Sequence, residues 1–374
     1  METTFISSTA PNSINKTFFL PVKKVVKETD DATSLYFDIS NQEDVFRYKS
    51  GQHLILHFTI GEKKATRAYS LFTAPFEDDF AVTIKRVKGG LVSNHINDSI
   101  KAGDKIEVSA PRGLFTVKEN PGEPRAYYFF GGGSGITPLL SNIKTVLKEQ
   151  PSSQVFFLYG NRNKNSIIHH EVLNKLQKKY PDRLQIEHEL ESEGGFFGKG
   201  LLSNLLQAKT GWIDRRRILY FLNENPSSLP SEYFICGPTG MMNNVEDVLS
   251  ELGTDPATVH SERFGSDLLS VSEPDDSDVK VKTAELTFSI NGIRKEIPIA
   301  GSKTLFESLT KAGEDIPHSC LSGSCASCAC RIKKGKVKMK QCYALNETQL
   351  KDNFILSCQA IPHTKVIEVD FDII

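Results

Sequence analysis

Cys320-Leu-Ser-Gly-Ser-Cys325-Ala-Ser-Cys328 is the stretch on which the interpretation of the whole chain depends, and Cys358 follows after 29 intervening residues. The spacing C-x4-C-x2-C with one distant cysteine is the plant-type ligand pattern of a [2Fe–2S] cluster, in which four thiolates hold two irons. The small residues between the cysteines let the loop wrap closely around a cluster, and Gly323 can adopt a positive φ without strain. We therefore predict Cys320, Cys325, Cys328 and Cys358 as the metal ligands and one-electron transfer as the chemistry.

A zinc site and a disulfide framework both suit these cysteines less well. A zinc site usually combines C-x2-C with a second close pair, whereas Cys358 stands alone. A disulfide framework belongs to an oxidising compartment, and the N-terminus Met1-Glu-Thr-Thr-Phe-Ile6 lacks the basic region and apolar core of a signal peptide. The remaining cysteines of this region, Cys330 and Cys342, are interpreted as small structural side chains.

Composition limits the classes of function. The chain has 374 residues, of which 39% are hydrophobic and 24% charged, as in an ordinary soluble globular protein of two or three domains. The formal net charge of −1 gives no reason to expect nucleic acid or an anionic membrane as a partner. No apolar run reaches the ~18–20 residues of a membrane span. We expect a cytoplasmic, multidomain protein.

The pattern of hydrophobic, polar and turn-forming residues changes along the chain. Residues 17–120 alternate short β-branched or aromatic runs with Gly, Pro and Asp, which predicts a small antiparallel β-barrel. Residues 121–265 alternate strands with helices, which predicts a doubly wound parallel α/β sheet. Residues 266–283 are acidic and rich in serine, as is typical of a flexible linker. Residues 284–374, which contain the cysteines, are expected to form an α+β domain.

Hydrophobic periodicity predicts the individual elements. Strands are expected at 34–39, 53–60, 80–85, 105–108, 125–130, 154–159, 184–187, 232–236, 285–290, 294–299 and 366–371. Helices are expected at 91–100, 136–150, 171–180, 241–252 and 305–312.

A glycine-rich turn, Gly131-Gly-Gly-Ser-Gly-Ile-Thr-Pro138, follows a predicted strand and opens a predicted helix. Free N–H groups at a helix start, together with glycines that allow close approach, form a diphosphate site. The motif is not a strict G-x-G-x-x-G, because Ile136 occupies the place of the last glycine. The alternative is a tight turn that binds nothing.

The end of the next strand bears on the choice of nucleotide. A dinucleotide fold that prefers NAD usually has a carboxylate here for the adenosine ribose, whereas an arginine accepts a 2′-phosphate. The strand ends Tyr159-Gly-Asn-Arg162, and no carboxylate follows until Glu171. Arg162 therefore favours NADPH over NADH.

Two segments of the predicted barrel suit a flavin. Arg67-Ala-Tyr-Ser70, between predicted strands, offers a cation for a phosphate, a ring for the flavin and a hydroxyl for its redox edge. Arg86-Val-Lys-Gly-Gly-Leu-Val-Ser93 places glycines before a helix start, where a phosphate can bind. Two polar runs lie outside these motifs: Arg215-Arg-Arg217 is interpreted as a solvated loop and His169-His170 as surface.

The order R-x-Y-S, K-R-x-x-G-G-x-x-S, G-G-G-S-G-I-T-P and C-G-P (Cys236-Gly-Pro238) resembles the ferredoxin–NADP reductase superfamily. The C-terminal module makes the chain similar to oxygenase reductases that carry a fused plant-type ferredoxin, which has a β-grasp fold. Tyr48–His53, Arg67–Ser70 and Val259–Phe264 most resemble the reductase subunits of phenylacetyl-CoA epoxidases, which act in phenylacetate catabolism. The similarity covers about residues 17–372.

This resemblance implies roles for individual residues. Arg67 would contact the FAD pyrophosphate, Tyr69 would pack against the flavin, and Ser70 would lie near its N5. Cys236 would approach the nicotinamide, and Glu262 and Phe264 would cover the flavin on that side. The implied catalytic residues are Ser70, Cys236, Glu262 and Phe264. The implied cofactor-binding residues are His53, Arg67, Ala68, Tyr69, Ser70, Lys85, Val87, Gly89, Gly90, Leu91, Val92, Ser93, Gly133, Ser134, Gly135, Thr137, Arg162, Gly237 and Pro238.

The predicted function is an electron-transfer reductase that passes electrons from NADPH to FAD, then to the [2Fe–2S] cluster, then to an oxygenase or epoxidase component. A two-electron donor needs a flavin between it and a one-electron cluster. The nearest alternative is the same reductase serving another hydroxylating oxygenase or a hybrid-cluster protein. An iron–sulfur redox sensor would have lost Arg67, Tyr69 or the Gly131–Gly135 turn, and a zinc-binding interaction module would be colourless.

Overall fold

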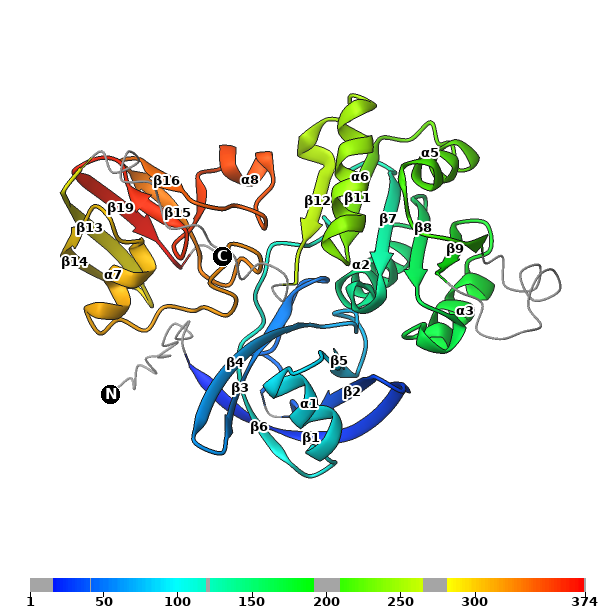
Figure 1. Ribbon diagram of the computed structural model, residues 1–374, viewed down its shortest axis with the longest axis horizontal. Coiled ribbons are helices and arrows are strands. Elements are labelled where there is room, and N and C mark those ends of the chain that lie inside the picture. Colours follow the sequence, from blue (N-terminus) through cyan, green and yellow to red (C-terminus); the bar gives the residue numbers. More distant parts are fainter. Residues whose placement is uncertain (1–15, 41, 119–121, 192–208, 265–280, 373–374) are drawn as a thin grey trace, which may run out of the picture.

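A computed structural model describes residues 16–40, 42–118, 122–191, 209–264 and 281–372. Three sheets form three domains, with the barrel domain at the bottom of Figure 1, the parallel-sheet domain at the upper right and the cysteine-loop domain at the left. This confirms the predicted fold class. Most of the predicted linker, residues 266–280, lies outside the described residues. None of the helices within the described ranges has the length and apolar character needed to span a membrane.

The barrel domain is one antiparallel sheet of strand order β4-β3-β6-β1-β2-β5. A bridge between Leu71, just after β4, and Val82 on β5 joins the two edges of this sheet. The residues Arg67–Ser70, expected between strands, form the second half of β4. The elements are β1 (Thr17–Thr29), β2 (Ala32–Phe37), β3 (His53–Ile60), β4 (Lys63–Ser70), β5 (Phe80–Lys85), α1 (Leu91–Ser99) and β6 (Lys105–Ser109).

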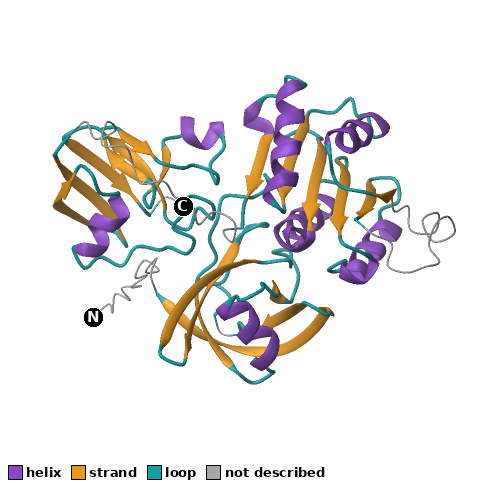
Figure 2. Cartoon of the chain, viewed as in Figure 1, coloured by secondary structure: helices purple, strands orange, loops and turns teal. Residues whose placement is uncertain are grey.

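The parallel-sheet domain has strand order β10-β9-β8-β7-β11-β12, and every pair is parallel. Successive side chains of β7 face opposite sides, so Tyr127 and Phe129 pack with α2 and α3, whereas Tyr128 and Phe130 pack with α5 and α6. Helices therefore cover both faces, as Figure 2 shows. The elements are β7 (Ala126–Gly132), η1 (Gly133–Gly135), α2 (Ile136–Glu149), β8 (Gln154–Asn161), η2 (Lys164–Ser166), α3 (His170–Lys179), β9 (Leu184–Leu190), β10 (Lys209–Thr210), α5 (Arg215–Glu224), β11 (Ser231–Cys236), α6 (Thr239–Glu251), η3 (Pro256–Thr258) and β12 (Val259–Glu262).

The order of strands in this sheet reverses at β7, since β8 and β9 extend from one side of it and β11 and β12 from the other. In open α/β sheets, ligands bind outside the carboxyl ends of the strands at such a switch point. β7 ends in the glycine-rich turn, and β11 ends beside it at Cys236, which is paired with Gly131. The fold thus brings the two sequence motifs together.

The cysteine-loop domain has a five-stranded sheet of order β14-β13-β19-β15-β17, in which only β13 and β19 are parallel, and a small second sheet of β16 and β18. Cys328, Cys330 and Cys358 belong to its buried core. The elements are β13 (Thr283–Ile290), β14 (Ile293–Ala300), α7 (Leu305–Lys311), β15 (Ala329–Lys334), β16 (Val337–Met339), α8 (Glu347–Lys351), β17 (Phe354–Leu356), β18 (Ala360–Pro362) and β19 (Val366–Asp370).

The interpretation of Arg215–Arg217 as a solvated loop is wrong for Arg217. This residue lies in the first turn of α5 and is only 8% exposed. Its Nη2 lies 2.7 Å from a carboxylate oxygen of Glu187, and its Nε lies 2.5 Å from one of Glu189. Two charges on β9 thus balance the buried guanidinium, which is the condition for burying a charge.

The placement of His169 on the surface is also wrong. Its ring is buried, with Nε2 at 2.9 Å from the Thr83 hydroxyl and Nδ1 at 3.3 Å from a Glu28 oxygen. The ring also lies 4.1 Å from that of Phe72. All three partners belong to the barrel domain, so His169 helps to join the first two domains.

Candidate functional site

The four cysteines of the motif lie in two pairs. The Cys325 thiol donates a hydrogen bond to Cys320, and Cys328 is hydrogen-bonded to Cys358. Within the described part of the chain, no cluster of three or more His, Cys, Asp or Glu side chains could hold a single metal ion. Two thiol pairs, one for each iron, suit a binuclear cluster and do not suit a four-ligand zinc site.

The backbone of the cysteine loop turns towards the sulfur atoms. The N–H groups of Ser322 and Ser324 both donate to Cys320 Sγ at 3.4 Å. Gly323 has φ +79°, and a Cβ there would lie 2.9 Å from the carbonyl oxygen of Gln341. The hydrogen bonds from Cys325, Ser322 and Ser324 hold the pKa of Cys320 below its ordinary value even though burial opposes this, while the same pairing raises the pKa of Cys325. A thiolate is the form that binds metal, so the loop fits an iron–sulfur cluster.

Cys330 behaves differently from the motif cysteines. It lies on β15 and is fully buried, and this burial raises the pKa of its thiol. Its environment is therefore that of a small apolar side chain, as expected for a structural residue.

The cysteine loop contacts the barrel domain through Ser327. Its Oγ lies 2.9 Å from Nε2 of His53 on β3, and its carbonyl oxygen accepts a hydrogen bond of 3.3 Å from Arg112. His53 is 1% exposed, and burial together with Arg112 lowers its pKa to about 4. The imidazole is therefore neutral at pH 7. One residue of the loop thus touches a residue expected to bind the flavin.

On its other side, His53 lies beside a buried carboxyl. Its Nδ1 is 3.9 Å from Glu262 Oε1, and the Ser70 hydroxyl donates to Glu262 Oε2 at 3.1 Å. Burial raises the pKa of Glu262 to about 8, although the hydrogen bond from Ser70 opposes the shift. At pH 7 most of this carboxyl is protonated, so it can hold a proton beside Ser70.

Three of the four predicted catalytic residues come together. Cys236 on β11 is paired with Glu262 on β12, and burial together with that carboxyl raises the pKa of the Cys236 thiol. Ser70 reaches the same point from β4 of the barrel domain. Phe264 lies two residues beyond β12 and is 37% exposed, so its ring is available to cover a ligand.

The start of α1 is built to accept an anion. Gly90 is the N-cap and no side chain caps the helix, so the first N–H groups remain for an outside acceptor. Gly89 has φ +73° with open space where a Cβ would be, whereas a Cβ on Gly90 would lie 2.6 Å from Ser93 Oγ. Ser93 in turn accepts a hydrogen bond of 3.1 Å from the N–H of Val87. This segment fits a phosphate group of a dinucleotide.

The other predicted flavin contacts in the barrel domain vary in exposure. The Arg67 side chain is exposed and donates to the Thr66 carbonyl at 2.8 Å, so it can turn towards a ligand. Tyr69 and Ala68 are half-buried, and burial raises the pKa of Tyr69. Leu91 is exposed, whereas Val92 is buried in the barrel core.

The glycine-rich turn is shaped by close packing. A Cβ on Gly132 would lie 2.4 Å from Pro238 Cδ, and one on Gly135 would lie 2.0 Å from the Cys236 carbonyl oxygen. Gly237 also has no room for a side chain, because a Cβ there would lie 2.8 Å from the Gly132 nitrogen. Only glycine fits at these points, and neither η1 nor α2 has a side-chain cap. This leaves backbone N–H groups for a diphosphate.

Polar groups complete this turn. Thr137 Oγ1 donates to the Ser134 carbonyl at 3.1 Å, and the Tyr159 hydroxyl donates to the Gly133 carbonyl at 2.8 Å. Lys85, from β5 of the barrel domain, has its Nζ 3.3 Å from the Cβ position of Gly133. Burial lowers the pKa of Lys85. The barrel domain therefore places a cation at the turn.

Arg162 lies at the end of β8, as the sequence predicts, but it has a partner that the sequence does not indicate. It forms an ion pair with Asp31, from the turn between β1 and β2. Burial works against ionisation of Asp31, but Lys85, Thr29 and Arg162 together hold its pKa below the ordinary value. Arg162 remains 57% exposed in its side chain.

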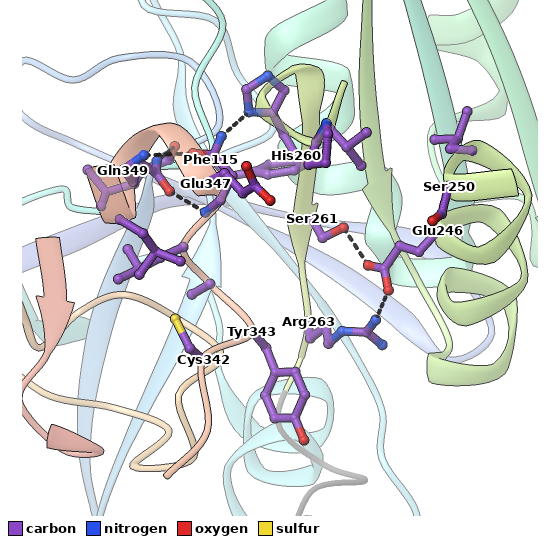
Figure 3. A pocket seen from close by; sticks show the side chains of 18 of the residues that line it. Phe115, Glu246, Ser250, His260, Ser261, Arg263, Cys342, Tyr343, Glu347 and Gln349 are labelled. Atoms are coloured by element: carbon purple, nitrogen blue, oxygen red, sulfur yellow. Dashed lines mark hydrogen bonds and ion pairs between the residues drawn. The ribbon is translucent and has the colours of Figure 1, made fainter. Parts of the chain in front are cut away.

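A second contact joins the cysteine-loop domain to the parallel-sheet domain around a cavity of about 400 Å³ (Figure 3). The Asn346 amide donates to His260 Nδ1 of the parallel-sheet domain at 2.9 Å, and the Gln349 amide donates to the carbonyl of Leu114, which belongs to the barrel domain, at 3.2 Å. The Arg263 guanidinium lies 5.6 Å from the centre of the Tyr343 ring. Hydrogen bonds and a cation–π contact thus connect the domains around a cavity whose lining also includes the apolar side chains of Phe115, Leu249 and Leu345.

Sequence reasoning missed Ser327, Arg112 and Asp31. Ser327 lies between Cys325 and Cys328, so its place inside the cysteine motif could have marked it as a functional residue. Asp31 lies in a turn and Arg112 in an isolated β-bridge with His53, and their roles depend on contacts with residues far away in the chain.

Three family models match the chain in succession. Residues 20–117 match an oxidoreductase FAD-binding domain, and residues 129–247 match an oxidoreductase NAD-binding domain. Residues 288–363 match a 2Fe-2S iron-sulfur cluster binding domain. The FAD-binding, nucleotide-binding and cluster-binding domains that the motifs predict are therefore present.

Curated relatives match over nearly their whole length. A subunit of the 1,2-phenylacetyl-CoA epoxidase of Escherichia coli (strain K12) is 33% identical over 94% of this chain and 97% of its own. The ferredoxin reductase component of the 3-ketosteroid-9-alpha-monooxygenase of Rhodococcus rhodochrous is 33% identical over 96% of this chain and 97% of its own. Among solved structures, phthalate dioxygenase reductase aligns with a TM-score of 0.55 over 95% of this chain and 98% of its own, at 21% identity.

The paired thiols predict which cysteines hold the cluster. Replacing any one of Cys320, Cys325, Cys328 and Cys358 by serine should abolish the visible [2Fe–2S] absorption, because one iron then loses a thiolate. Cys330→Ser is the matched control and should retain the spectrum. Loss of the cluster in Cys330→Ser with retention in Cys325→Ser would show that the ligand assignment is wrong.

The buried carboxyl of Glu262 predicts a pH dependence of stability. The ordinary pKa of 4.5 applies to the unfolded chain, and the folded value is about 8. Between these values the folded state binds more protons, so its stability falls as pH rises, by up to about 1.4 kcal/mol per pH unit. Glu262→Gln should remove this component, so the variant should become more stable relative to the native chain between pH 5 and pH 8.

The measurement is chemical denaturation of both cofactor-free proteins at several pH values. Glu224→Gln, at an exposed position on α5, is the control and should follow the native curve. A constant difference between Glu262→Gln and the native protein from pH 5 to pH 8 would contradict the raised pKa.

Proposed function

Because the chain belongs to the family of FAD- and [2Fe–2S]-containing reductases that supply electrons to oxygenases, we propose that it takes electrons from NADPH and delivers them to the epoxidase component of a phenylacetyl-CoA epoxidase. The oxidoreductase assignment follows from the family. The nucleotide, the acceptor, the residue roles and a cytoplasmic location are our proposals.

One observation supports this order of transfer above the others. His53 touches Ser327 of the cysteine loop on one side and lies beside Glu262 and Ser70 on the other. A flavin bound at Ser70 would therefore lie between the nucleotide-binding turn and the cluster loop. FAD supplies the step from two-electron to one-electron chemistry, and the protein holds the three sites in sequence.

The barrel domain would bind FAD through three kinds of contact. Arg67 and the start of α1, at Gly89 to Ser93, would hold the phosphates. Tyr69 would lie along the ring system, and Phe264 would cover its opposite face until the nicotinamide enters. Ser70 and the protonated Glu262 would hold a proton near the reacting edge.

The parallel-sheet domain would bind NADPH at the switch point. The N–H groups of Gly133, Ser134 and Gly135 would face the diphosphate, with Thr137 fixing the turn. Gly237 and Pro238 would keep the nicotinamide end close to Cys236. Arg162 would bind the 2′-phosphate, which would replace the Asp31 carboxylate as its anionic partner.

The acceptor is proposed from the three segments that resemble epoxidase reductases, Tyr48–His53, Arg67–Ser70 and Val259–Phe264. A second candidate is a steroid-hydroxylating oxygenase, since the Rhodococcus reductase component is also 33% identical. Both candidates require the same electron path and differ only in the protein that receives the electrons.

Reconstitution tests the acceptor. The purified protein, supplied with NADPH, should support product formation by the E. coli phenylacetyl-CoA epoxidase components when it replaces the homologous polypeptide of that enzyme. The Cys358→Ser variant should not, because the cluster is the proposed exit. The 3-ketosteroid-9-alpha-monooxygenase oxygenase from R. rhodochrous serves as the comparison. Faster turnover with the steroid oxygenase would overturn the assignment of the epoxidase as acceptor, but the assignment of this chain as a reductase would stand.

Arg162 predicts the nucleotide preference. Arg162→Ala should raise the KM for NADPH about 10- to 100-fold, since a charge-assisted phosphate contact contributes about 1.5–3 kcal/mol. The KM for NADH should change little, because NADH lacks the 2′-phosphate. Lys175→Ala, at an exposed position on α3, is the control. Equal changes for both nucleotides would mean that Arg162 does not bind the 2′-phosphate.

A further inference from the structure

The cysteine-loop domain carries an unusual concentration of positive charge. Residues 316–346 contain six Lys or Arg residues and no Asp or Glu, although the whole chain has a net charge of −1. These residues are Arg331, Lys333, Lys334, Lys336, Lys338 and Lys340.

Three of these lysines belong to one short strand and the residues that flank it. β16 alternates, so Val337 and Met339 pack against the domain core while Lys336, Lys338 and Lys340 are placed on the other side. Lys336 and Lys338 are exposed and Lys340 is partly exposed. We call Lys336, Lys338 and Lys340 the basic strand. In Figure 1 it lies at the upper edge of its domain, away from the barrel domain.

Two lysines of the basic strand, Lys336 and Lys340, have no carboxylate partner among the described residues. Lys333, on β15, has a carboxylate nearby, because its Nζ lies 3.8 Å from a carboxylate oxygen of Asp370. The strand opposite β16 is Ala360–Pro362, which has no charge. Among the described residues, Lys336 and Lys340 form no ion pair, whereas Lys338 has a contact of its own.

The basic strand is tied directly to the cysteine loop. The N–H of Lys340 donates to the Gln359 carbonyl at 3.0 Å, next to Cys358. The Gln359 side chain donates to the Leu321 carbonyl at 2.8 Å. Leu321 lies between the first two motif cysteines and is 45% exposed. Gln359 thus connects Leu321, which carries an exposed apolar side chain, to Lys340 at the end of the basic strand.

The loop therefore has two different faces. Ser327 is buried against His53 and Arg112 of the barrel domain. Leu321 and the basic strand face solvent while that contact is made. Electrons that arrive through the buried face can leave through the exposed one without separation of the domains.

We propose that Leu321 and the basic strand form the docking surface for the electron-accepting protein, which presents an acidic patch to it. The inference rests on the proposed function, because it assumes that the cluster is the exit. A basic patch beside a redox centre raises the association rate of an acidic partner by about 10- to 1,000-fold at low salt. The exposed apolar side chain of Leu321 favours a protein partner over a nucleic acid, because the core of a protein–protein interface is apolar.

The test reverses charge at two lysines. Lys336→Glu/Lys340→Glu changes the net charge by −4, and Lys303→Glu/Lys311→Glu, at exposed positions in and before α7, is the control with the same change. The probes are cytochrome b5, an acidic haem protein, and cytochrome c, a basic one. The measurements are the second-order rates of their NADPH-supported reduction against ionic strength, and the Kd for cytochrome b5 by calorimetry.

At low salt the basic-strand variant should reduce cytochrome b5 at least tenfold more slowly and bind it more weakly, and it should reduce cytochrome c faster. Both differences should vanish near 0.5 M salt, because screening then acts within roughly 3–10 Å. The control variant should match the native protein.

Equal behaviour of the two variants would overturn the docking surface. If the native protein reduced neither cytochrome although its cluster absorbs normally, the proposed function itself would fall. If the lysine substitutions weakened binding to duplex DNA but left the reduction of both cytochromes unchanged, the partner of this surface would be a nucleic acid and not an acidic protein.

Discussion

The contact between His53 and Ser327 is the constraint on which the arrangement of the three domains depends. Because both side chains are nearly inaccessible to solvent, their hydrogen bond of 2.9 Å fixes the cysteine loop against the wall of the barrel. The low pKa of His53 keeps its ring neutral, so the contact needs no buried counter-charge. An aspartate or lysine at either position would have to become neutral at a cost in free energy or weaken the contact.

Close packing imposes a similar constraint at the nucleotide-binding end. The turns after β7 and β11 approach until only glycine fits at Gly132, Gly135 and Gly237. Cys236 also lies next to Glu262, because β11 pairs with β12, and burial raises the pKa of Glu262. The steric limit at the turns therefore arises within the parallel-sheet domain, whereas the buried carboxyl of Glu262 also contacts Ser70 of the barrel domain.

The sequence predicts features that depend on neighbouring residues and fails where distant residues meet. The cysteine spacing and the glycine turn are local, so their chemistry can be inferred directly, and the three sheets follow from periodicity. The prediction for Arg217 is wrong because its partners, Glu187 and Glu189, lie on a strand about 30 positions earlier. His169 is misplaced because its partners belong to another domain. Neither contact leaves a pattern in the chain.

The contact around Asn346 and His260, which leaves a cavity between the domains, has a consequence for kinetics. The cysteine-loop domain is covalently joined to the other two, so its docking is an intramolecular event with an effective concentration on the order of millimolar. A weak interface is then sufficient to keep the loop at His53. Electron passage inside the protein is first order and does not change when the protein is diluted, whereas delivery to any separate acceptor falls in proportion to its concentration.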